Sequence, residues 1–129
     1  MQTTCSMRKG KTLIRRGNQY FFCQNFDQAM QCYEAARRQA EWLFDDWDEP
    51  EEAVSSFVVT HHNIADVYQK RGEVAAAREI LESVHAFILK AVTSTPISDG
   101  RHPALYRASI ITYSTLMVHK RCHLLSNLH

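Results

Sequence analysis

The sequence has few residues that interrupt a helix and few segments typical of a strand. It contains four glycines and three prolines in 129 residues. The strict alternation of apolar and polar residues that marks a half-buried strand is almost absent. The clearest break is the segment 93–103, TSTPISDGRHP, and shorter breaks surround Pro50 and Gly72. Between these breaks apolar residues recur every three or four positions, so the sequence predicts an all-α fold.

Long apolar runs are missing too. No stretch approaches the ~20 consecutive apolar residues that a membrane-spanning helix needs. The N-terminal segment, MQTTCSMRKGKTLIRRG, is basic but lacks the apolar centre of a secretory signal. We therefore expect a single cytoplasmic domain over residues 1–129 that has no membrane partner.

Motifs of catalysis and cofactor binding are also absent. The sequence has no HExxH, no nucleophile elbow and no glycine-rich phosphate loop. Its four cysteines form no CxxC pair and are more typical of reduced thiols than of a disulfide framework, with Cys23 and Cys32 expected as small buried residues. Bases cluster only over residues 8–16, a weak signal for nucleic acid. We expect a protein that is not an enzyme, has no cofactor and does not bind nucleic acid.

The breaks divide the chain into about five expected helices, which cover residues 6–23, 26–47, 50–71, 74–92 and 103–127. Pro50 and Pro103 suit the first turn of a helix, and Gly72 suits the left-handed residue beyond a C-terminus. Because only two or three residues join most neighbours, these helices are expected to lie antiparallel. The predicted architecture is an antiparallel stack of helical hairpins.

Two segments share one pattern of small and large residues. The first segment contains Gly17, Tyr20, Ala29, Tyr33 and Ala36. The second contains, at the same separations, Ala65, Tyr68, Ala77, Leu81 and Val84. Small residues let two helices cross closely, and large residues fill the space beside them. We therefore expect a close helix crossing at Gly17 and Ala29, and an internal repeat.

This pattern resembles the tetratricopeptide repeat (TPR), which residues 13–36 and 61–84 match. The resemblance implies an α–α superhelix with hairpins at 6–47 and 50–92 and a C-terminal capping helix at 103–127. Gly17 and Ala65 are 48 residues apart, whereas TPR units recur every ~34 residues. The helices on either side of Pro50 are therefore expected to be over-long.

The resemblance implies an adaptor or chaperone-like module whose first helices line a concave groove for a protein or peptide. The implied groove residues are Lys11, Ile14, Asn18, Phe21, Phe22, Val59, His62, Asn63, Asp66, Gln69 and Lys70. Some TPR domains clamp a peptide carboxylate with asparagines, which Asn18 and Asn63 match, but Ile14 occupies the expected lysine position. The exposed end helices could also pair two chains as a homodimer.

The alternative hypothesis is a metal-binding sensor or metal-dependent enzyme. His119 and His123 are one helical turn apart, and Cys122 lies beside them. Zinc sites need three or four ligands, and the sequence identifies no further one. Histidines near a helix C-terminus are also favoured there by the helix dipole.

Charge is unevenly distributed along the chain. Residues 41–52 carry seven acids and no base, whereas five bases precede Asp27 and only bases follow Asp99. This asymmetry either steers a charged partner towards residues 45–52 or reflects a solvated helix junction with basic flanks.

Overall fold

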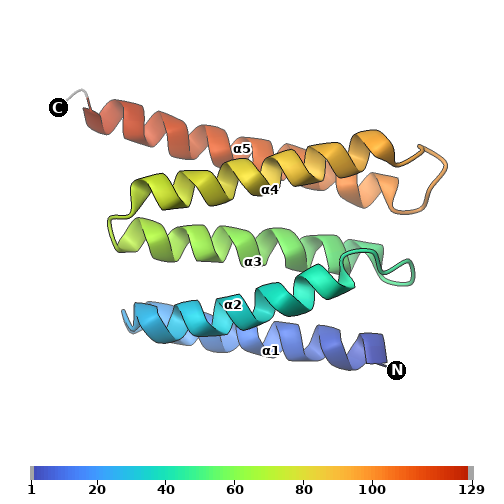
Figure 1. Ribbon diagram of the computed structural model, residues 1–129, viewed down its shortest axis with the longest axis horizontal. Helices are drawn as coiled ribbons and strands as arrows, with labels where there is room; N and C mark the ends of the chain where they lie inside the picture. The colour runs from blue at the N-terminus through green and yellow to red at the C-terminus, as the bar shows by residue number, and fades with distance from the viewer. Residues whose placement is uncertain (1, 128–129) are drawn as a thin grey trace.

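The computed structural model describes the backbone of residues 2–127 and the side chains of residues 7–124. Over this range the chain forms five α helices and no strand. The helices are α1 (Gln2–Phe22), α2 (Phe26–Leu43), α3 (Pro50–Lys70), α4 (Val74–Ser94) and α5 (His102–Asn127). Consecutive helices run antiparallel in one stack, with α2 in front of α1 and α4 in front of α5 (Figure 1). The predicted all-α stack is confirmed.

Two predicted boundaries are off by four residues, and the others agree to within two. The first helix begins at Gln2 rather than at residue 6. The second helix ends at Leu43 rather than at residue 47, and residues 44–49 form the connection to α3. In this connection the backbone N–H of Asp48 donates to the Asp46 carboxylate at 3.0 Å. Short acidic side chains that bond nearby backbone groups compete with the helix in this way.

The two turns within the hairpins have the same geometry. Gly72 adopts φ +79°, as predicted, and Gln24 adopts φ +62° in the corresponding turn. The N–H groups of Glu73 and Asn25 each bond the carbonyl five residues earlier, at 2.8 Å and 2.9 Å. Both turns are therefore Schellman motifs, which commonly end helices. Gln24 lacks the conformational freedom of glycine, which usually occupies this left-handed position.

The predicted close crossing of the first two helices is confirmed at Gly17. A Cβ atom added there would lie 2.5 Å from a ring carbon of Tyr33, so only glycine fits. Tyr33 is 2% exposed and donates its hydroxyl to Asn18 Oδ1 at 2.5 Å. Ala29 is fully buried beside it.

The cysteine prediction is only half right. Cys32 is buried, as expected, but Cys23 is exposed because it follows the last residue of α1 in the turn. Cys5 lies outside the residues whose side chains are described. No disulfide joins Cys23, Cys32 and Cys122.

The apolar core consists of three clusters of buried side chains between neighbouring helices. Its largest cluster draws on α2, α3, α4 and α5 and consists of Ala40, Phe44, Val54, Phe57, Val58, Val84, Ile88, Val92, Ala104, Leu105 and Ala108. His61 sits beside it, 8% exposed, with its Nδ1 2.7 Å from the Phe57 carbonyl oxygen. Burial lowers the pKa of His61. This favours the neutral ring, which packs against Phe57 as a large apolar side chain would.

None of the five described helices is both long and apolar enough to cross a membrane.

Candidate binding groove

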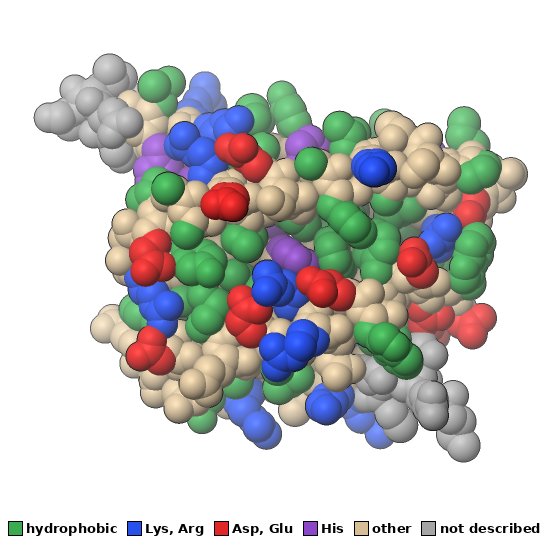
Figure 2. Space-filling view, in the orientation of Figure 1, with side chains coloured by type: hydrophobic (Ala, Val, Ile, Leu, Met, Phe, Trp, Pro, Cys, Tyr) green, Lys and Arg blue, Asp and Glu red, His purple; other side chains and the backbone are tan. Residues whose placement is uncertain are grey.

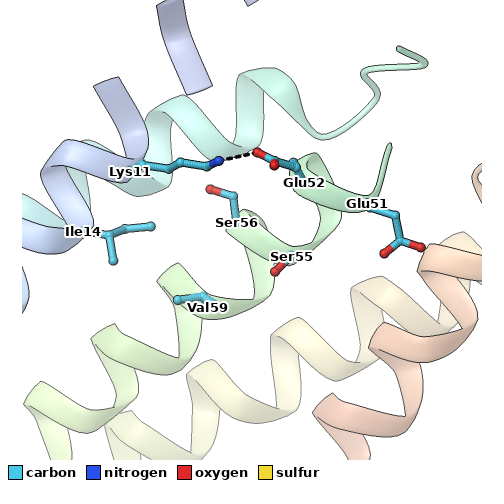
Figure 3. A pocket seen from close by; sticks show the side chains of 7 residues that line it. All are labelled: Lys11, Ile14, Glu51, Glu52, Ser55, Ser56 and Val59. Atoms are coloured by element: carbon cyan, nitrogen blue, oxygen red, sulfur yellow. Dashed lines mark ion pairs between the residues drawn. The ribbon is translucent and has the colours of Figure 1, made fainter. Parts of the chain in front are cut away.

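A hollow lies between α1 and α3, with a volume of about 430 Å³. Ile14 of α1 and Val59 of α3 point towards each other across it, and Ser55 and Ser56 line its α3 side (Figure 3). Helical spacing explains the α3 contribution, because Ser55 and Val59 are one turn apart on the same face. The floor is therefore apolar and the α3 wall carries hydroxyl groups.

A second hollow, of about 210 Å³, lies between α3 and α5. On α5 it is lined by Ala104, Arg107, Ala108 and Ile111. Glu51, Ser55 and Val59 belong to both hollows. The two therefore join along α3, and we call the combined surface the α1–α3–α5 groove.

Two ion pairs close one end of this groove. Lys11 Nζ lies 2.5 Å from Glu52 Oε2, and Arg107 pairs with Glu51. Adjacent acids in the first turn of α3 thus tie it to the helix on either side. All four side chains are about half exposed or more, so each pair contributes at most about 1 kcal/mol to stability, and their main effect is to position the groove walls.

The same contacts bear on the acidic segment 45–52. Asp45 pairs with Arg101 at 2.9 Å, and the Arg101 guanidinium carbon lies 4.1 Å from the centre of the Trp47 ring. Together with Glu51 and Glu52, three acids of this segment are paired with bases from distant parts of the chain. Much of the charge asymmetry in the sequence is therefore balanced within the fold.

His62 supplies a neutral polar group to the α3–α5 part of the groove. Burial, followed by the neighbouring His61, lowers its pKa to about 4. Its Nε2 atom is buried and has no hydrogen-bond partner among the described residues. A buried nitrogen without a partner is costly, and a ligand group that bonds it would relieve that cost.

Only part of the predicted groove set lines the groove: Lys11, Ile14, Val59 and His62. The Asn18 side chain instead accepts the hydrogen bond from the Tyr33 hydroxyl described above. Phe21 is half-buried and packs against Phe26 with ring centres 5.5 Å apart, whereas Phe22 is 84% exposed. One of the two aromatic residues is thus a core residue and the other is a surface residue.

The remaining predicted residues lie on α3 beyond the two hollows: Asn63, Asp66, Gln69 and Lys70. Although Asp66 is exposed, surrounding protein atoms desolvate its carboxyl and raise its pKa, an effect that Lys70 partly offsets. Asp66 also adds to the effect of burial in raising the pKa of Tyr33 to about 12.

Sequence reasoning missed the contribution of α5. Ala104, Ala108 and Ile111 have the same spacing of four and seven residues as Ala29, Tyr33 and Ala36. That spacing was the available signal, and it was overlooked because α5 was interpreted only as a cap. Ser55 and Ser56 could have been found by counting back one turn from Val59.

The C-terminal histidines come together without a third ligand. The rings of His119 and His123 lie 4.4 Å apart between centres, and His123 Nε2 lies 3.3 Å from Gln69 Oε1. Burial, followed by His123, lowers the pKa of His119. Across the described side chains, no group of three or more His, Cys, Asp or Glu residues is placed to hold a metal ion, so Cys122 does not complete a set.

A further hollow, of about 430 Å³, opens on the opposite face among α2, α3 and α4. Hydrophobic side chains gather along the seam between α2 and α4 on this face (Figure 2). Its aromatic wall is Phe44, Phe57 and Phe87, with Phe57 and Phe87 stacked at 5.0 Å. Its acids pair with bases, Glu41 with Arg37 and Asp45 with Arg101. None of the groove residues predicted from the sequence lines this hollow, so the α1–α3–α5 groove is the preferred candidate.

Comparison with known proteins identifies a family but no activity. The family model described as "Protein of unknown function (DUF2753)" matches residues 9–127, so the chain belongs to that family. No curated protein matches the chain, and no solved structure does.

Proposed function

We propose that this member of the DUF2753 family is a TPR-like adaptor that binds a peptide or a helix of a partner protein in the α1–α3–α5 groove. The observation that carries the proposal is the continuity of the two hollows, which share Glu51, Ser55 and Val59. A surface that runs across three helices is long enough for several consecutive residues of a ligand. The matched spacings from Gly17 and Ala65 add the family resemblance in support.

The chemistry of the groove suits binding through apolar side chains. Ile14, Val59 and Ile111 offer apolar surface from three helices. The charges at its end are already paired with each other, so they contribute little free attraction. Ligand affinity is expected to come mostly from apolar burial, at about 25 cal/mol per Å², while His62 and the two serines orient the ligand through hydrogen bonds.

A peptide library displayed on phage would test the proposal. Peptides selected on the unmodified protein would be titrated against it and against Val59→Asp by fluorescence anisotropy. A carboxylate in the apolar floor should weaken binding by about tenfold or more. Val59 is 41% exposed, so the substitution should leave the fold intact, which thermal unfolding would verify.

Leu89→Asp is the matched control. Leu89 is 46% exposed, a similar fraction, but it lies on α4 and lines neither hollow. Its substitution should leave peptide affinity unchanged. Equal loss of binding in both variants, or no loss in Val59→Asp, would overturn the assignment of the groove.

A further inference from the structure

The outer face of α5 is apolar. Six of its large side chains are between 51% and 65% exposed: Tyr106, Ile110, Ile111, Tyr113, Val118 and Leu124. Ile111 lines the α1–α3–α5 groove, and the other five lie outside it. The opposite face of the same helix is buried through Leu105, Thr112 and Leu116, among others. A helix that is apolar on both faces is normally covered on both, yet the described chain covers only one.

The exposed side chains have the spacing of a packing seam. Positions 106, 110, 113, 117, 120 and 124 are separated alternately by four and three residues, which is the repeat of a coiled coil. Exposed Tyr106, Ile110, Tyr113 and Leu124 occupy four of these positions, and exposed Lys120 occupies another. The remaining position is taken by Met117, which is half-buried against the core, and exposed Val118 lies outside the series. We call these six positions the α5 seam. Its geometry fits a helix lying along α5.

The basic residues of α5 indicate the charge that a partner helix should carry. Residues 102–127 contain Arg107, Lys120 and Arg121 but no acid. Arg107 pairs with Glu51, whereas Lys120 and Arg121 have no ion-pair partner among the described side chains. One unpaired base within the seam, Lys120, and one beside it, Arg121, favour a partner that places acids opposite this end of the seam.

A second copy of the chain is a poorer match. An antiparallel pair of α5 helices centred on Tyr113 would bring Arg107 towards Lys120 of the other copy, and a parallel pair would oppose the two Lys120 side chains. Helix α1 offers no acid either, because its charged residues are Arg8, Lys9, Lys11, Arg15 and Arg16. Like charges without a neutralising acid weaken each of these arrangements.

We infer that the α5 seam docks an acidic amphipathic helix of a different protein. The apolar stripe of that helix packs on Tyr106, Ile110 and Tyr113, and its acidic flanks lie opposite Lys120 and Arg121. This surface is separate from the α1–α3–α5 groove, since none of these five residues lines either hollow. The inference therefore stands independently of the proposed function.

Two designed helical peptides provide the probes. Both carry leucine at the seam positions of each heptad, but one carries glutamate at the flanking positions and the other carries lysine. By fluorescence anisotropy at low salt, the glutamate peptide should bind at least about tenfold more tightly than the lysine peptide. Raising the salt concentration should reduce this difference, because both bases are exposed.

Variants separate docking from nonspecific attraction. The double substitution Lys120→Glu with Arg121→Glu should reverse the preference between the two peptides, and Ile110→Asp should abolish binding of the glutamate peptide. Val59→Asp, in the groove, should leave that binding unchanged, so failure of the groove and failure of the seam are distinguishable. Equal binding of both peptides, binding of neither, or a stable homodimer in sedimentation that buries α5 would overturn the inference.

Discussion

The two end helices of the stack differ in what they present outwards. The exposed charged side chains of α1 are bases, and the only large apolar side chain it exposes in the described range is Phe22, at its C-terminal end. The outer face of α5 carries the apolar α5 seam instead. Neither helix contains an acid. A terminal element of a helical stack needs a polar outer face to remain soluble. The outer face of α1 meets this requirement, whereas α5 has apolar side chains on both its inner and its outer face.

The largest expected effect separates the two faces of α5. Leu105→Ala removes a side chain that is 2% exposed in the main core cluster, and it should lower the free energy of unfolding by about 2–5 kcal/mol. Ile110→Ser, on the outer face, should change that free energy by less than about 0.5 kcal/mol. Urea denaturation of both variants measures the difference.

A large loss in Ile110→Ser would show that the α5 seam is already covered in the protein in solution. The proposed difference between the two end helices would then be wrong, because the apolar outer face of α5 would not be exposed to solvent.

The second test concerns how α1 is attached. Gly17→Ala should lower the free energy of unfolding by about 1–3 kcal/mol, because its Cβ would collide with the buried Tyr33 ring. Gly10→Ala in the same helix is the matched control, since its Cβ would meet Gln39 Cβ at an ordinary 3.8 Å. The control should raise stability by up to about 1 kcal/mol through helix propensity. Thermal or urea unfolding distinguishes the two, and equal effects would contradict a tight crossing at Gly17.

The smallest effect is a dependence of the free energy of unfolding on pH, caused by His62 on the α5 side of α3. The pKa of His62 falls from 6.5 to about 4 on folding, so its contribution is complete above pH 6.5 and is lost as the pH falls towards 4. Between pH 7 and pH 5 the free energy of unfolding should decrease by roughly 1–2 kcal/mol. His62 lies against α5, and no histidine lines the α1–α3 hollow.

His62→Gln keeps a polar side chain but cannot titrate, so it should remove most of this pH dependence. Part would remain, because burial also lowers the pKa of His61. An identical decrease in the unmodified protein and in His62→Gln, measured by urea denaturation at both pH values, would show that other groups control the acid response.

The helices were predictable from the sequence because their interruptions are few and strong. Pro50 and Gly72 fix two boundaries through backbone chemistry alone. The end of α2 was not predictable, since no glycine or proline lies between Leu43 and Asp48 and the Asp46 side chain bonds the backbone only beyond the end of the helix. The left-handed conformation of Gln24 was equally hidden, because glutamine is not a residue type that favours a positive φ.

The candidate site was predictable only where one helix determines it. Val59 and His62 could be placed from their spacing on α3, but the α5 wall depends on which helix packs beside α3, a long-range property. Asn18 shows the same limit, because its amide was predicted to face a ligand and instead accepts a hydrogen bond from Tyr33 of α2. The asymmetry of charge was visible in the sequence, but its resolution into pairs such as Lys11 with Glu52 was not.

With five antiparallel helices, the first helix begins and the last helix ends on opposite sides of the domain. Because α1 starts at one side of the stack and α5 finishes at the other (Figure 1), the backbone enters and leaves on opposite sides. At 1.5 Å per residue, a 21-residue helix such as α3 spans roughly 32 Å. Fluorophores or proteins fused to the two ends would therefore be held at least about this distance apart, because the ends are also separated across the stack from α1 to α5.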